Sequence, residues 1–117
     1  MKNLLFICSQ NKLRSPTAEA IFADTPGIEV DSAGLNHDAV TTVSGDLIEW
    51  ADIIFVMEKT HRSKLQKRFP DVLGGKRVVT LGIPDIYDYM DPALVELLRT
   101  QLRRYIPALS REDPHAR

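Results

Sequence analysis

The sequence predicts an α/β fold, a three-layer sandwich in which helices cover both faces of a parallel β-sheet. Short apolar stretches of strand length alternate with stretches of helical periodicity along the 117 residues. This alternation is typical of parallel strands joined by right-handed crossovers. The strongest strand candidate, residues 53–57, is apolar throughout, as expected for a strand buried on both faces. No linker, repeat or low-complexity stretch divides the sequence, so we expect one domain over residues 1–117.

The first third of the chain predicts two strands and one helix. Residues 2–7 contain the apolar run at 4–7 and are followed by polar residues, which favours a buried strand. A Ser-Pro pair at 15–16 predicts the N-cap and first residue of a helix, which Thr, Pro and Gly at 25–27 should end. Residues 28–32 are the second strand candidate, and residues 35–42 have the character of a loop without further signal.

The alternation continues in the rest of the chain. An apolar stripe within residues 43–50 predicts a short helix, and residues 60–69 alternate basic and apolar side chains at helical spacing. Residues 77–81 follow a Gly-Gly turn and give the fourth strand candidate. Asp and Pro at 91–92 predict the cap and first turn of a last helix reaching about residue 106. Residues 110–117 are expected to form a flexible tail.

Composition excludes several classes of function. The net charge of -1 and the pI of about 6.3 provide no basic field for nucleic acid or an anionic membrane. No apolar stretch is long enough for a membrane span or a signal peptide, so we expect a cytoplasmic protein. The single cysteine excludes an internal disulfide, and the histidines at 37, 61 and 115 show no ligand spacing. We therefore expect no metal and no cofactor.

The strongest functional signal is the stretch from Cys8 to Ser15, between the first strand and the first helix. A loop at a helix N-terminus can direct several backbone N–H groups at an anion, and the same field favours a thiolate at Cys8. Arg14, six residues after Cys8, can bind phosphate oxygens with both arms of its guanidinium. Asn11 tolerates a left-handed turn within the loop, and the Ser15 hydroxyl can reach the Cys8 sulfur.

These residue types favour phosphoryl transfer by covalent catalysis. Cys8 would attack phosphorus, while Arg14 and the loop amides would neutralise the phosphoryl oxygens. The competing interpretation is that Cys8 is only a small buried hydrophobic residue, as a lone cysteine commonly is. The expected phosphate-binding residues are Ser9, Gln10, Asn11, Lys12, Leu13, Arg14 and Ser15.

A general acid is expected in the acidic and aromatic stretch at 82–92, which leaves the same edge of the sheet as the nucleophile. Asp85 and Asp88 are competing candidates for that role, and Tyr87 and Tyr89 could flank an aromatic substrate.

Two charged stretches are expected to be solvated surface rather than binding sites. Glu58 and Lys59 follow the third strand and should lie in an exposed loop. The basic residues of the next helix should form its exposed face; they are His61, Arg62, Lys64, Lys67 and Arg68.

These residues together resemble the low-molecular-weight protein tyrosine phosphatases. The first motif, Cys8 and Arg14 separated by five residues and followed by Ser-Pro, is highly specific, and the resemblance extends over most of the chain. Further similar stretches are Ala-Glu-Ala at 18–20, Asp-Ser-Ala-Gly at 31–34, and residues 51–57 and 83–87. The resemblance implies a four-stranded parallel sheet in the order 2-1-3-4 and a cysteinyl-phosphate intermediate formed without a metal.

The resemblance also assigns roles to residues around the predicted pocket. Asp85 rather than Asp88 becomes the general acid, and Tyr87 takes the place of the aromatic residue that flanks the substrate. Lys12 stands where the family often has an apolar residue, which makes the pocket rim cationic. Leu13 replaces a second cysteine, so the nucleophile has no partner for a protective disulfide.

We therefore expect a phosphatase that acts on phosphotyrosine or a related phosphomonoester, carried by a phosphorylated protein or a small phosphate ester. One alternative is a phosphate- or phosphoprotein-binding module without turnover, because Gln10 replaces a common glycine, Lys12 replaces a common apolar residue, and the stretch between 34 and 51 is short for the family. Another alternative is a phosphocysteine carrier, against which Arg14 argues, since a carrier must release its phosphoryl group. The sequence distinguishes neither phosphotyrosine from phosphoarginine nor one oligomeric state from another.

Overall fold

A four-stranded parallel sheet forms the centre of the molecule, in the order β2-β1-β3-β4. The computed structural model describes residues 1–107 and 109. Its strands are β1 (Lys2–Cys8), β2 (Ile28–Gly34), β3 (Ile53–Val56) and β4 (Arg77–Thr80). The α/β class, the parallel pairing and the strand order expected from the sequence are confirmed.

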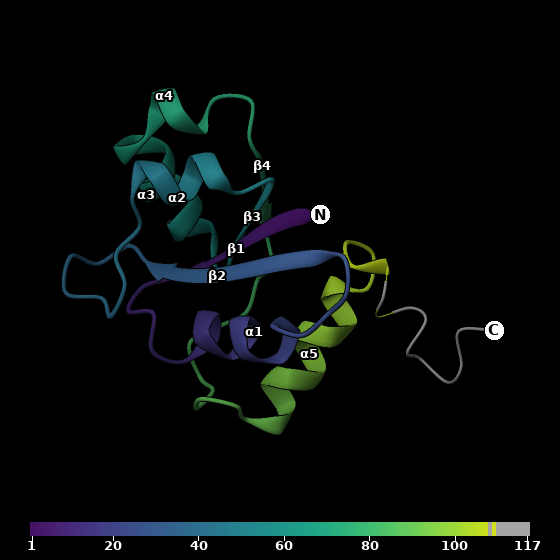
Figure 1. Ribbon diagram of the computed structural model, residues 1–117. Helices are drawn as coiled ribbons and strands as arrows, with labels where there is room; N and C mark the ends of the chain where they lie inside the picture. Colours follow the sequence, from purple (N-terminus) through teal and green to yellow (C-terminus); the bar gives the residue numbers. More distant parts are fainter. Residues whose placement is uncertain (108, 110–117) are drawn as a thin grey trace.

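Helices cover both faces of this sheet (Figure 1). Helices α1 (Arg14–Phe22) and α5 (Pro92–Leu102) lie side by side on one face, and the other face carries α2 (Gly45–Trp50), α3 (Lys59–Arg68) and α4 (Pro70–Leu73). None of the helices within residues 1–107 is long and apolar enough to cross a membrane. The flexible tail predicted at 110–117 lies outside the described residues.

Strand β1 separates two apolar cores because its side chains alternate between the two faces of the sheet. Leu4, Phe6 and Cys8 belong to the core beneath α1 and α5, whereas Leu5 and Ile7 belong to the core beneath α2 and α3. The four apolar residues have no exposed surface, and Cys8 is 3% exposed. The nucleophile candidate is therefore the last residue of a strand whose final five residues are all buried.

The first helix begins two residues earlier than the predicted start. Helix α1 starts at Arg14 with Leu13 at the N-cap position, so the predicted capping role of Ser15 is wrong. The Ser15 side chain is buried and directed at the Cys8 sulfur, so it does not accept from the free N–H groups of the helix.

Helix α5 differs from expectation only at its end, and α4 is an additional helix. Asp91 caps α5 as predicted, since its Oδ1 accepts from the Ala93 N–H at 2.9 Å. Helix α5 ends at Leu102 rather than near residue 106, and the chain continues in a turn. The short helix α4 was not predicted, because four residues are too few to show a helical period.

The 35–42 segment, which carries no local signal in the sequence, folds back against the 8–14 loop and forms backbone hydrogen bonds with it. The N–H groups of Leu35, Asn36 and Val40 donate to the carbonyl oxygens of Cys8 at 3.0 Å, Ser9 at 3.0 Å and Gln10 at 3.1 Å, respectively. Three consecutive carbonyls of the 8–14 loop are therefore held toward this segment.

Helix α3 begins with a capping box formed by Glu58 and His61. The Nδ1 atom of His61 accepts a hydrogen bond from the Glu58 backbone N–H at 3.1 Å. Burial, reinforced by the nearby Arg14 guanidinium, lowers the pKa of His61 to about 4, and its exposed fraction is only 1%. The imidazole is therefore neutral at neutral pH.

We predict that Gly34→Ala destabilises the protein by about 1–3 kcal/mol, the usual range for overpacking. A Cβ at this position would lie 2.6 Å from the Ala39 Cβ and 2.7 Å from the Ser9 carbonyl oxygen, so backbone must move. Urea denaturation would measure the loss. Gly45→Ala is the matched control, because its added Cβ has no neighbour closer than 3.8 Å. Equal stabilities of the two variants would contradict the close packing at Gly34.

We also predict that His61 makes folding stability depend on pH between its unfolded pKa of 6.5 and its folded pKa of about 4. In this window the unfolded chain binds a proton that the folded protein excludes, so the free energy of unfolding falls as the pH falls. The loss due to His61 should reach about 2–3 kcal/mol near pH 4. Denaturation of wild type and His61→Gln across this range would isolate it. Parallel curves for the two proteins would contradict the prediction.

Candidate active site

A pocket of about 150 Å³ opens at the carboxyl end of the sheet, beyond the last residue of β1. The loops that follow β1, β2 and β4 gather at this edge, on the left of Figure 1. The pocket is lined by Cys8, Ser9, Gln10, Lys12, Leu13, Arg14 and Asp85. The structure therefore brings together the predicted nucleophile, arginine and acid, from stretches that are far apart in sequence.

The backbone of the 8–14 loop presents its amides to the pocket. In a trans peptide the C=O of one residue and the N–H of the next point in opposite directions, and no peptide bond here is cis. Because the carbonyls of Cys8, Ser9 and Gln10 are held by the 35–42 segment, the following N–H groups face the opposite way. The Asn11 N–H accordingly donates to the Cys8 sulfur at 3.3 Å. The loop is thus an array of donors suited to an anion.

The Cys8 sulfur has a second hydrogen-bond partner, the Ser15 hydroxyl at 3.0 Å. Ser15 lies in the first turn of α1 and has no exposed surface. The hydroxyl and the Asn11 N–H can both donate to sulfur, and such donors stabilise a thiolate over a thiol. The environment of Cys8 therefore differs from that of an inert buried cysteine.

Asn11 holds the turn of this loop in place. Its φ angle of 56° is in the left-handed region, which asparagine tolerates better than most residues. Its side-chain Nδ2 donates to the Ser15 hydroxyl at 3.0 Å and to the Ser32 hydroxyl at 2.9 Å. The Ser32 hydroxyl in turn bonds to the Glu19 carboxylate. This buried chain of hydrogen bonds connects the loop to β2 and α1.

The guanidinium of Arg14 is buried beside the pocket, with 3% of the residue exposed. It donates to the Ile83 carbonyl oxygen at 2.8 Å and lies 3.5 Å from the Glu58 carboxylate and 3.7 Å from the Asp85 carboxylate. Partners on two different loops therefore orient its planar donors before any ligand is present. Such an arginine can bind a tetrahedral oxyanion through two oxygens at once.

The acidic and aromatic residues of the 82–91 loop differ in their exposure and in whether they line the pocket. Asp85 lines the pocket and remains 63% exposed, whereas Asp88 is exposed and is not among the lining residues. Tyr87 is half-buried against the core beneath α1 and α5, and Tyr89 is 53% exposed. Geometry thus favours Asp85 as the acid, while the role of Tyr87 beside a substrate stays a prediction.

Two residues at the site were not expected from the sequence. Glu58 was interpreted as loop surface but lies 3.5 Å from Arg14. His61 was assigned to an exposed face but is buried, with its Nε2 2.9 Å from the Ser9 hydroxyl. The exposed basic face is confirmed for the other members, which are Arg62, Lys64, Lys67 and Arg68. Glu58 could have been found from the strand order, because β3 is adjacent to β1 and ends beside the pocket.

Within residues 1–107, histidine, cysteine and acidic side chains form no group of three or more that could hold a metal ion.

Comparison with known proteins gives concordant results at the level of sequence. The family model described as "Low molecular weight phosphotyrosine protein phosphatase" matches residues 3–49, which include most of β1, the 8–14 loop and most of α2. A relative from Ralstonia nicotianae, named as a probable low molecular weight protein-tyrosine-phosphatase EpsP, is 29% identical. That match covers 93% of this chain and 87% of the relative.

Solved structures share the fold along nearly the whole chain. The tyrosine phosphatase Wzb from Escherichia coli K30, in complex with phosphate, has a TM-score of 0.74 at 22% identity, covering 91% of this chain and 96% of its own. The YwlE arginine phosphatase from Geobacillus stearothermophilus has a TM-score of 0.71 at 23% identity, covering 98% of this chain and 99% of its own. Family model, relative and fold agree: the chain is similar in sequence to the low molecular weight protein tyrosine phosphatases and shares their fold.

Proposed function

We propose that this chain hydrolyses phosphotyrosine or a related phosphomonoester through a cysteinyl-phosphate intermediate, without a metal. The observation that carries the proposal is the Cys8 sulfur, which lies 3.0 Å from the Ser15 hydroxyl and accepts from the Asn11 N–H, at the floor of a pocket walled by Arg14. A thiolate so placed faces the position that a phosphorus atom takes when its oxygens bind the loop amides.

In the first half of the reaction, the Cys8 thiolate attacks phosphorus. The Sγ–P bond forms as the bond from phosphorus to the leaving oxygen breaks. Arg14 and the inward amides of Ser9 to Ser15 bind the three equatorial oxygens, where charge accumulates in the transition state. Asp85 gives its proton to the leaving oxygen, so that a neutral alcohol or phenol departs.

In the second half, the Asp85 carboxylate takes a proton from a water molecule as that water attacks phosphorus. The P–Sγ bond breaks, which releases inorganic phosphate and restores the thiolate. Ser15 donates a hydrogen bond to the departing sulfur: its oxygen accepts from Asn11 at 3.0 Å, and the sulfur at 3.0 Å is a closer acceptor for its proton than the Ala33 carbonyl oxygen at 3.4 Å. Asn11 and Ser15 therefore organise the loop in both steps.

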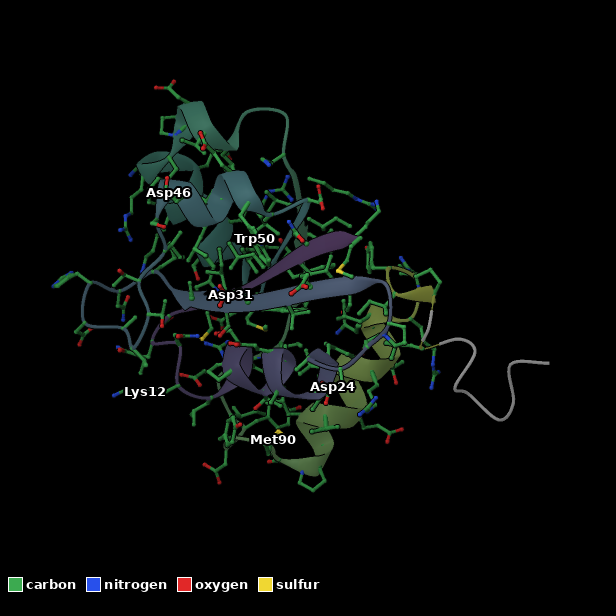
Figure 2. The ribbon with its side chains drawn as sticks, in the orientation of Figure 1. Lys12, Asp24, Asp31, Asp46, Trp50 and Met90 are labelled. Atoms are coloured by element: carbon green, nitrogen blue, oxygen red, sulfur yellow. The ribbon has the colours of Figure 1, made fainter. Side chains whose placement is uncertain are left out.

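The positive charge at the rim of the pocket favours a substrate whose groups next to the phosphoryl group are anionic or neutral. Figure 2 shows the Lys12 side chain extending from the loop between β1 and α1 into solvent. Lys12 and Tyr87 are proposed to flank the substrate, and an exposed ammonium there disfavours a cationic group next to the phosphoryl group. We propose a phosphorylated protein or a small phosphate ester in a cytoplasmic setting; phosphoarginine remains the alternative suggested by the name of the Geobacillus enzyme.

The two non-enzymatic alternatives receive less support. The short stretch after Gly34 motivated a binding module, yet the 35–42 segment bonds to three carbonyls of the 8–14 loop and holds it in a donor-inward form. A phosphocysteine carrier must release its phosphoryl group to a partner, and a buried, pre-oriented Arg14 opposes that release.

We predict that Cys8→Ser lowers the turnover of an aryl phosphate by at least about 10³-fold, because the replacement hydroxyl is a far weaker nucleophile. The variant should still bind inorganic phosphate, measured by calorimetry, since the amides and Arg14 are unchanged. Intact mass of the wild type after rapid quenching should reveal a phosphoryl adduct that Cys8→Ser lacks. Phosphate binding by both proteins without turnover or adduct would support the binding module instead.

We predict that Asp85→Ala slows a poor leaving group more than a good one. Loss of the proton donor should reduce phenyl phosphate turnover by about 10²–10⁴-fold, the usual contribution of a general acid. The loss for p-nitrophenyl phosphate should be much smaller, because its leaving group needs little protonation. Asp88→Ala, in the same loop, is the matched control and should not change the ratio of the two rates. A changed ratio in Asp88→Ala alone would transfer the acid role to Asp88.

A further inference from the structure

The Ser9 hydroxyl is connected to the interior of the protein by one buried side chain. Ser9 is half-buried, follows the nucleophile directly and lines the pocket. Its Oγ lies 2.9 Å from Nε2 of His61, on the first turn of α3. Since a hydroxyl can donate or accept, the direction of this hydrogen bond decides where the Ser9 proton points.

The tautomer of His61 follows from its second nitrogen. Nδ1 lies 3.1 Å from the Glu58 backbone N–H, which can only donate, so Nδ1 must present a lone pair. The single proton of the neutral imidazole is then on Nε2. The Glu58 carboxylate lies 3.5 Å from Nε2 and favours the same assignment, because it attracts an N–H and repels a lone pair.

The proton on Nε2 determines the orientation of the serine. Nε2–H donates to Ser9 Oγ, which uses one of the lone pairs of the hydroxyl and turns its hydrogen away from the ring. No other hydrogen-bond partner of Ser9 Oγ is found among residues 1–107. The free direction is therefore toward the pocket that Ser9 lines.

We propose that His61 is a positioning residue that directs the Ser9 hydroxyl hydrogen into the pocket, where it binds a phosphoryl oxygen beside the loop amides. Ser9 thus adds one side-chain donor to the backbone donors of the loop. This inference rests on the proposed function only in requiring that the pocket binds phosphate.

Burial, modified by charges on neighbouring elements, keeps this arrangement constant at neutral pH. Burial, Arg14 and Lys64 lower the pKa of His61 while Glu58 and Asp85 raise it, and the net value of about 4 leaves the imidazole neutral. Protonation would place a hydrogen on Nδ1 and remove the acceptor for the Glu58 N–H.

The direct test is the tautomer of His61 in the wild-type protein. A long-range ¹H–¹⁵N correlation spectrum at pH 7 should show Nε2 protonated and Nδ1 bare, with His61 assigned through the signal missing in His61→Gln. A proton on Nδ1 would overturn the proposal, because Nε2 would then accept from Ser9 and hold its hydrogen away from the pocket. The spectrum is independent of activity, so it remains informative even if Cys8 proves not to be a nucleophile.

The functional test compares phosphate affinity in four variants. Ser9→Ala should weaken inorganic phosphate binding about tenfold, the lower range for a hydrogen bond to a charged group. His61→Leu should weaken it similarly, but should add nothing in a Ser9→Ala background, since both changes remove one donor. His61→Gln should retain most of the affinity, because glutamine suits the capping position and its amide can donate to Ser9.

Two outcomes would overturn the proposal. Wild-type phosphate affinity in Ser9→Ala would show that the hydroxyl does not reach the ligand, whether or not the His61 variants fold. Additive losses in the Ser9→Ala, His61→Leu double variant would mean that His61 only stabilises the fold.

Discussion

The site depends on the direction in which a few peptide groups face. Along the 8–14 loop, three carbonyls are bonded to the 35–42 segment, and peptide planarity then directs the next N–H groups to the other side. An array of parallel donors with no anion between them is electrostatically unfavourable, so it needs external support to persist. The segment after β2 supplies that support through backbone hydrogen bonds alone.

Strand order provides the side chains around this loop. Because all four strands are parallel and β1 lies between β2 and β3, the residues just beyond β2, β3 and β4 lie at the same edge of the sheet as its carboxyl end. Glu58 follows β3 and holds both Arg14 and the start of α3, while Asp85 comes from the loop after β4. Two carboxylates and one carbonyl thus share one buried guanidinium, which restricts the rotamers of Arg14 and lowers the entropy lost when a ligand binds.

Local sequence predicted the parts of the site whose signal lies within a few residues. Cys8, Arg14 and the cap at Asp91 sit beside clear strand and helix signals, and the apolar stretches gave all four strands. Ser15 was misassigned as a cap because the same Ser-Pro pattern suits a hydroxyl that turns inward to sulfur. His61 has a basic, polar neighbourhood in sequence, and its burial follows only from the packing of α3 against the 8–14 loop. The 35–42 segment contacts the 8–14 loop through backbone hydrogen bonds, and the pattern of side chains in a sequence does not predict such bonds.

A pocket whose donors are already in place has a kinetic consequence. The groups proposed to bind the phosphoryl oxygens of a substrate are equally matched to free orthophosphate, the product, because both present the same tetrahedral face. Arg14 and the loop amides are held by other parts of the protein, so their positions do not change when the ester bond is broken. In the proposed reaction, product therefore competes with substrate for the vacant enzyme, and a rising concentration of orthophosphate lowers the share of molecules open for the next turnover.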